Sequence, residues 1–187
     1  VGIDSEKWSP DLDSKSLDFL IYDKGMWNRD NFQSSLLDPI LSTLSGKGAS
    51  FEIIRYGHYE PASYSEKLAR AKAMIFLSEH ETQGLAYQEA LSCNVPIFAW
   101  DKGGFWQDPY YFPNKVKFEP VSSVPYWDER CGMRFKNVED FNCNIEIFMK
   151  RVSENLFSPR EYVLENLTLE ICAEKYIRIV NSMYINI

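Results

Sequence analysis

Short apolar segments alternate with longer amphipathic segments through the first hundred residues of the chain. The apolar segments are typical of buried strands, and the amphipathic ones have the spacing of helices. We predict strands at residues 17–22, 50–55, 73–77 and 95–100, a short strand near 116–118, and helices at 31–44, 64–72 and 84–93. Strands interleaved with helices favour a parallel sheet that is covered on both faces. The sequence therefore predicts an α/β fold of three layers.

Composition narrows the function classes. The chain has 187 residues, 45% of them hydrophobic, so residues 1–187 can bury the core of a single domain. A formal net charge of -7, without a long basic run, argues against nucleic acid and anionic lipid as partners. The four cysteines include no closely spaced pair, which disfavours a zinc cluster or a disulfide scaffold. No apolar stretch is long enough for a membrane span.

The pattern of alternation changes after residue 101. Residues 102–135 carry many aromatic residues and several prolines, which suits an ordered irregular insertion better than a flexible linker. Helical periodicity returns over residues 138–187. It is interrupted at Ser158-Pro159, and we expect a terminal helix with an apolar face at residues 164–184.

The segment after the third predicted strand is the strongest candidate for a functional site. Glu81 and Glu89 stand eight positions apart, and Gly84 lies between them at the predicted start of a helix. In open α/β sheets, ligands bind beyond the carboxyl ends of the strands, which is where this segment lies. A polar loop followed by a helix N-terminus also favours phosphate binding. The segment therefore predicts a site for a phosphorylated ligand.

This pattern resembles the C-terminal, donor-binding domain of retaining glycosyltransferases of the GT-B fold, in the family 4-like group (glycosyl transferases group 1). Glu81 and Glu89 fit the Glu, seven residues, Glu signature of that group. The other matching segments are Gln83-Gly84-Leu85, Glu89-Ala90-Leu91, Asn94-Val95-Pro96 and the pair Gly103-Gly104. Residues 1–15 resemble the hinge segment that enters the domain. The resemblance covers residues 1 to about 105 and implies a Rossmann-like half of a two-domain enzyme, whose N-terminal acceptor domain is absent from this chain.

The resemblance implies roles for four charged residues in binding and catalysis. Lys24 and Arg29 match the basic pair that neutralises the donor diphosphate and assists departure of the nucleotide, although the family commonly has Arg first and Lys second. Glu81 corresponds to the glutamate beside the donor sugar, and we group it with the basic pair as catalytic. Glu89 corresponds to the glutamate that accepts hydrogen bonds from the ribose hydroxyls.

Further donor contacts are expected around these residues. Amides at Gln83, Gly84 and Leu85 can bind phosphate or sugar at the helix N-terminus. His80 is a candidate because it adjoins Glu81, and Gly57 because it follows the second strand, where base contacts are expected. The remaining candidates are Gly103 and Gly104.

We expect no cofactor and no bound metal. Asp11-Leu-Asp13 imitates a metal-binding motif of a different glycosyltransferase fold, but it does not follow a predicted strand here. The group that the chain resembles works without a bound metal. The nucleotide-sugar is accordingly a substrate, and the basic pair supplies the positive charge.

The sequence therefore favours the donor domain of a retaining, hexosyltransferase-type enzyme of polysaccharide biosynthesis. Its partners would be a UDP-, GDP- or ADP-linked sugar and the N-terminal domain of the full-length protein. We expect a cytoplasmic location, with the missing domain able to hold the enzyme at the inner membrane face, and nucleotide binding without turnover by this domain alone. Two alternatives stay open: a non-catalytic nucleotide-binding or assembly module derived from this fold, and a nucleotide-sugar epimerase with the GT-B fold.

Overall fold

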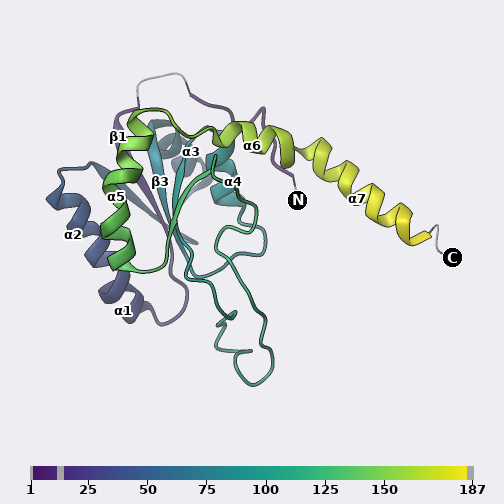
Figure 1. Ribbon diagram of the computed structural model, residues 1–187, viewed down its shortest axis with the longest axis horizontal. Coiled ribbons are helices and arrows are strands. Elements are labelled where there is room, and N and C mark those ends of the chain that lie inside the picture. The colour runs from purple at the N-terminus through teal and green to yellow at the C-terminus, as the bar shows by residue number, and fades with distance from the viewer. Residues whose placement is uncertain (1, 12–14, 185–187) are drawn as a thin grey trace.

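Five parallel strands form the centre of the molecule, in the order β2-β1-β3-β4-β5 (Figure 1). The computed structural model describes residues 2–11 and 15–184. The strands are β1 (Leu17–Lys24), β2 (Phe51–Arg55), β3 (Ala71–Ser78), β4 (Ile97–Trp100) and β5 (Gly132–Phe135). All neighbouring pairs in this sheet are parallel. The prediction of a Rossmann-like α/β fold is confirmed.

Helices cover both faces of the sheet (Figure 1). One face carries α1 (Arg29–Phe32), the π-helical turn η1 (Gln33–Leu37), α2 (Asp38–Gly46) and α5 (Val138–Ser153). The other carries α3 (Pro61–Arg70), α4 (Leu85–Ser92) and α6 (Pro159–Asn166), and α7 (Leu169–Tyr184) follows. Side chains of β1 alternate between the two cores, since Leu20 packs with one and Ile21 with the other. A strand that is buried on both faces reads as a continuous apolar run, which is why β1 and β3 could be predicted.

Two predicted elements differ from the structure. The strand predicted near residues 116–118 is wrong, and the fifth strand is β5. A Cβ at Gly132 would lie 2.0 Å from the Ile97 carbonyl oxygen, so β5 can pair with β4 only because a glycine stands there. Glycine has low strand propensity, which concealed this short strand in the sequence. The terminal helix predicted at residues 164–184 is divided between α6 and α7, and the Thr168 hydroxyl accepts a hydrogen bond from the Ile171 amide at the start of α7.

The irregular segment between β4 and β5, which we call the excursion (residues 101–131), projects beyond the carboxyl ends of the strands (Figure 1). Its two arms are joined by hydrogen bonds from Trp106 N to the Phe118 carbonyl, 2.9 Å, and from Val121 N to the Gly104 carbonyl, 3.0 Å. The Asp101 carboxylate anchors the returning arm through the Ser122 hydroxyl, 2.9 Å. Backbone pairing thus gives the excursion a defined path although it contains neither helix nor strand.

The N-terminal part of the described chain lies beside α6. Ile3 N donates to the Leu167 carbonyl over 2.7 Å, so part of the entry segment predicted at residues 1–15 lies along the junction of α6 and α7. Val1 and residues 12–14 of that segment, including Asp13 of the motif at 11–13, lie outside the described residues.

Helix α7 runs away from the sheet (Figure 1), and several of its apolar side chains are exposed to solvent. The exposed large apolar residues of α7 are Leu169, Tyr176, Ile177, Ile179 and Met183. Among residues 2–11 and 15–184, no helix has the length and apolarity needed to cross a membrane.

Candidate functional site

Lys24 and Glu81 meet at the carboxyl edge of the sheet. The β1–β3 register places Lys24 opposite Ser78, and Glu81 follows in the loop after β3. Lys24 Nζ donates to Glu81 Oε1 over 2.7 Å, and the Ser78 hydroxyl donates to the same oxygen over 3.0 Å. The Glu81 side chain is 8% exposed, so the pair is largely shielded from water. Two residues that the sequence assigned to catalysis are thus in direct contact.

A pocket of about 340 Å³ lies over this ion pair, and we call it the α4 pocket. It is lined by Tyr22, Lys24, Tyr56, Tyr59, Glu81, Thr82, Gln83, Gly84, Leu85, Ala86 and Glu89. The pocket therefore brings together Lys24, both glutamates of the signature and the Gln83-Gly84-Leu85 segment.

Helix α4 begins at the pocket with free amides. Gly84 precedes it in the left-handed conformation, φ 70°, and a Cβ there would lie 2.1 Å from the Tyr87 ring. The first hydrogen bond of the helix runs from Gln88 N to the Gly84 carbonyl, 3.2 Å. None of the described residues accepts a hydrogen bond from the amides of Leu85 and Ala86, which can therefore bind an anion. Gln83 lines the same pocket but lies before the helix.

Glu89 stands one turn further along α4, at the other end of the pocket. Burial raises the pKa of Glu89 to about 7, opposed by the charge of Lys7. Within residues 2–11 and 15–184, no side chain forms an ion pair with Glu89. The Glu89 carboxylate is thus desolvated and able to accept hydrogen bonds from a ligand.

Tyrosines form a wall of the α4 pocket that sequence reasoning missed. The Tyr22 and Tyr59 hydroxyls share a hydrogen bond of 3.0 Å, and Lys24 Nζ lies 4.6 Å from the centroid of the Tyr56 ring. Tyr56 and Tyr59 lie on either side of the predicted residue Gly57. Their position directly after the second strand could therefore have identified them as candidates. Gly57 adopts φ 76° in this turn but does not line the pocket.

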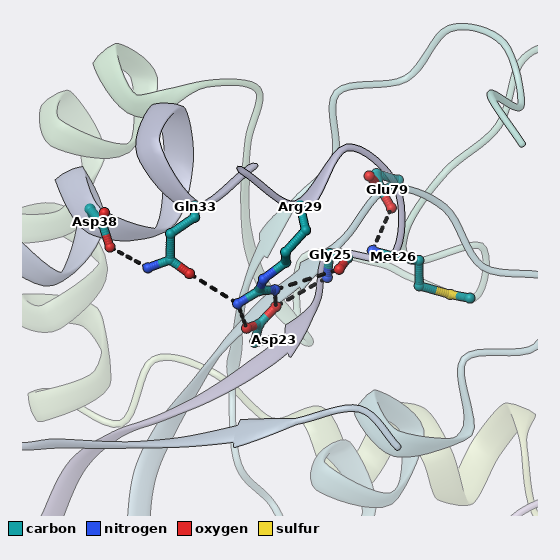
Figure 2. A network of polar contacts seen from close by, with 7 residues as sticks. All are labelled: Asp23, Gly25, Met26, Arg29, Gln33, Asp38 and Glu79. Atoms are coloured by element: carbon teal, nitrogen blue, oxygen red, sulfur yellow. Dashed lines mark hydrogen bonds and ion pairs between the residues drawn. The ribbon is translucent and has the colours of Figure 1, made fainter. Parts of the chain in front are cut away.

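Asp23, which is only 2% exposed, holds Arg29 away from the α4 pocket (Figure 2). The Nη1 and Nη2 atoms of Arg29 each donate to one oxygen of Asp23 over 2.6 Å. Nη2 also donates to Gln33 Oε1 over 3.0 Å. The hydrogen bonds to Asp23 raise the pKa of Arg29 above its usual range. Contact between Arg29 and a diphosphate in the α4 pocket would require the Asp23 pair to open.

The other predicted contacts lie in neighbouring regions. The His80 ring stacks on Trp27, with centroids 5.0 Å apart, and meets the edge of Trp106 at 5.5 Å. Burial lowers the pKa of His80 to about 4, so the ring is neutral at physiological pH. Gly103 and Gly104 line a separate open pocket of about 720 Å³ beside β5. These three residues therefore do not line the α4 pocket.

The excursion contributes to the site through the backbone of Ser122. The Glu81 amide donates to the Ser122 carbonyl over 2.9 Å, and the Tyr126 amide donates to the Tyr87 hydroxyl over 3.0 Å. These bonds fix the loop that carries Glu81 and the first turn of α4. The sequence left the role of the excursion open, since contacts between segments forty residues apart have no local signal.

Comparisons with known proteins agree with the fold. No protein-family model and no curated protein matches the sequence. Among solved structures, the chain is similar to the crystal structure of TarM, a glycosyltransferase, with a TM-score of 0.54 and 15% sequence identity over 92% of this chain. The chain spans 37% of the length of that TarM chain. This chain therefore shares the α/β fold of that structure.

Proposed function

We propose that the chain is the donor-binding domain of a retaining glycosyltransferase with the GT-B fold, and that the α4 pocket binds a nucleotide-activated sugar. The observation that supports this most directly is the composition of the pocket. It combines a cation, Lys24, with free amides at a helix N-terminus and with two carboxylates at opposite ends. Cations and helix N-termini suit a diphosphate, and carboxylates suit vicinal hydroxyls.

Each part of the donor then has a partner. The diphosphate would lie between Lys24 and the amides of Leu85 and Ala86. Glu89 would accept hydrogen bonds from the ribose hydroxyls, and Glu81 would orient the donor sugar. The rings of Tyr56 and Tyr59 offer apolar surface to the nucleoside.

Lys24 supports departure of the nucleotide in this proposal. An ammonium group has three donors, so Lys24 can keep Glu81 and still bind a phosphate oxygen. As the bond between the anomeric carbon and the phosphate oxygen breaks, the electron pair stays on the phosphate, where a fixed cation stabilises it. The acceptor hydroxyl forms its bond to the anomeric carbon on the same face of the sugar, and its proton passes to the departing phosphate oxygen. Arg29 is the second proposed cation, and neither role calls on a metal ion or another cofactor.

The acceptor would bind an N-terminal domain, which we propose as the partner of this chain. The exposed apolar side chains of α7 provide a surface for such a domain. A cytoplasmic enzyme of polysaccharide synthesis, held at the membrane through that domain, remains our proposal for its setting.

A titration with UDP, GDP and ADP, each with and without its linked sugar, tests the donor site. Chemical shifts of backbone amides provide the measurement, and we expect saturable changes at Leu85 and Ala86. If none of these nucleotides produces them while the chain remains folded, the donor site is refuted.

A non-catalytic nucleotide-binding module is the second candidate, because Asp23 holds the Arg29 guanidinium away from the pocket. Both candidates bind nucleotide, whereas only the first supports transfer in the full-length protein. Turnover of the bound nucleotide-sugar by the full-length protein therefore separates them.

A further inference from the structure

A second pocket, of about 290 Å³, lies on the opposite face of the sheet from the α4 pocket. We call it the tryptophan pocket. The residues used in the argument are Trp27, Asn31, Ser35, Glu79, Trp100 and Gln107. They come from the loop before α1, α1 itself, the turn η1, the residue after β3, the end of β4, and the excursion. None of them lines the α4 pocket.

The floor of the tryptophan pocket holds a buried carboxylate. Glu79 is 9% exposed, and the Met26 amide donates to its Oε2 atom over 3.4 Å, which is long for a hydrogen bond (Figure 2). Burial raises the pKa of Glu79, opposed by hydrogen bonds from the amides of Met26 and Trp27 and by the charge of Lys102. A carboxylate accepts about four hydrogen bonds. Glu79 therefore has capacity left for hydroxyl donors in the pocket.

The rim of this pocket carries neutral polar groups. Within the described chain, the Asn31 side-chain amide has no hydrogen-bond partner. The Ser35 hydroxyl donates to the Asn31 carbonyl over 2.6 Å, which leaves its oxygen able to accept. Gln107 accepts from Lys102 Nζ over 3.2 Å through Oε1, so its amide hydrogens remain available. The rim thus offers both donors and acceptors.

Two tryptophan rings supply the apolar surface, and both are held in place. One face of Trp27 stacks on His80, with the planes inclined by 22°. Trp100 donates its indole N–H to the Lys136 carbonyl over 3.0 Å, and its ring contacts Phe32 at a centroid distance of 5.8 Å. Rings that are fixed before binding lose little conformational entropy when a ligand packs on them.

The ligand that fits this combination is small, neutral and rich in hydroxyls. The volume is at the lower limit of ordinary ligand pockets, about 300 Å³ and above. Glu79 and Lys102 carry opposite charges, so the pocket has no excess charge to attract a phosphate. A pyranose ring has apolar C–H faces for the indoles and hydroxyls for the carboxylate and amides. We propose that the tryptophan pocket binds one neutral pyranose unit of a glycan.

This proposal goes beyond the donor site and does not depend on it. A glycan unit in the tryptophan pocket would be separated from the α4 pocket by the ends of β1 and β3. If the chain transfers sugars, the pocket would hold part of the acceptor chain. The adjoining π-helical turn η1 shapes the rim through Ser35, and such turns recur at functional sites.

Titration of the full 187-residue chain with methyl glycosides of glucose, galactose and N-acetylglucosamine tests the proposal. The indole N–H signals of Trp27 and Trp100 provide the measurement. We expect saturable shifts in the millimolar range with at least one of the three. Asn31→Ala should weaken that binding about fivefold, the effect of losing one hydrogen-bonding partner. Asn181→Ala, at an exposed site on α7, is the matched control and should bind like the wild type.

The same sample also distinguishes this pocket from the donor site. UDP should shift the amides of Leu85 and Ala86 and leave both indole signals unchanged. The proposal is overturned if none of the three glycosides shifts the indole signals, or if only the nucleotide does. It is also overturned if Asn31→Ala and Ser35→Ala, both folded by circular dichroism, retain wild-type affinity for the glycoside. A failure of UDP to bind would refute the donor site alone.

Discussion

Lys24 Nζ lies 2.7 Å from Glu81 Oε1, so the main cation of the α4 pocket is already paired with one of its carboxylates. The side chains of Lys24 and Glu81 are 18% and 8% exposed. Removing either charge leaves the other incompletely compensated in a poorly solvated place. Substituting Lys24 and substituting Glu81 should therefore change the affinity for a negatively charged ligand in different ways.

We expect Lys24→Ala to weaken UDP binding at least about tenfold, because a charge-assisted hydrogen bond contributes about 1.5 to 3 kcal/mol. Glu81→Gln should leave UDP affinity unchanged or increase it, since a negative charge near the diphosphate is removed. Glu81→Gln should also abolish any additional affinity that the UDP-linked sugar has compared with UDP alone. Calorimetry measures all three effects.

Lys72→Ala is the matched control for Lys24→Ala. Lys72 also forms an ion pair, with Asp18 over 2.8 Å, but it lines a different pocket. If the Lys24→Ala variant bound UDP as tightly as the Lys72→Ala variant, Lys24 would not be part of the donor site.

Arg29→Ala should lower the free energy of unfolding by about 2 to 3 kcal/mol, because it leaves the buried Asp23 carboxylate without its bidentate partner. Arg29→Lys keeps the charge but not the paired geometry, so its loss should be smaller. Urea unfolding measures both. Arg178→Ala is the control, since its pair with Glu174 is exposed on α7 and such pairs contribute about 0.5 kcal/mol. Equal losses for Arg29→Ala and Arg178→Ala would contradict a structural role for the Asp23 pair.

Glu89 should make stability depend on pH. Its pKa is about 7 in the folded chain and 4.5 ordinarily, so the folded state holds more protons between these values. Stability should therefore fall as pH rises from about 4.5 to 7, by about 1 to 2 kcal/mol after allowance for screening of a half-buried group. Urea unfolding of Glu89→Gln should lack this component. Because the pKa of His80 is lowered, His80 changes the free energy of unfolding in the opposite direction over part of this range. The wild type and Glu89→Gln are therefore compared with each other at each pH.

The same titration should govern donor binding. An ionised Glu89 accepts hydrogen bonds from ribose hydroxyls, so affinity for a nucleotide-sugar should rise as pH increases through about 7. Glu89→Ala should weaken the binding by about 1 to 3 kcal/mol. Calorimetry at a series of pH values tests this, with a nucleotide-sugar as ligand because its diphosphate has no terminal group that titrates near neutrality. A Glu89→Gln variant with the same pH profile as the wild type would contradict the assignment.

The α4 segment could be predicted from the sequence because its determinants are local. An apolar strand, a glycine and a helical period all lie within residues 73–93, and they place Glu81 in a loop and Glu89 on a helix. The long apolar strands β1 and β3 could be predicted for the same reason. These features needed no knowledge of distant contacts.

Contacts between distant segments could not be predicted in the same way. The sequence places Asp23 and Arg29 close together, but not in a bidentate pair, since that depends on how the turn after β1 folds over Asp23. The contact of Glu81 with Ser122 joins loops from two different strands. The tryptophan pocket likewise requires α1 and the excursion to meet, which only the folded sheet determines.

Gly84→Ala tests whether the start of α4 depends on its glycine. The residue has φ 70°, and an added Cβ would lie 2.1 Å from the Tyr87 ring, which is itself fully buried. Backbone strain and overpacking each cost about 1 to 3 kcal/mol, so we expect a loss of about 2 to 4 kcal/mol in urea unfolding. Gly46→Ala, in α2 where an added Cβ would meet no atom within 4 Å, should be neutral or slightly stabilising. If a stable Gly84→Ala chain bound UDP like the wild type, the amides at the start of α4 would not require this geometry to hold the diphosphate.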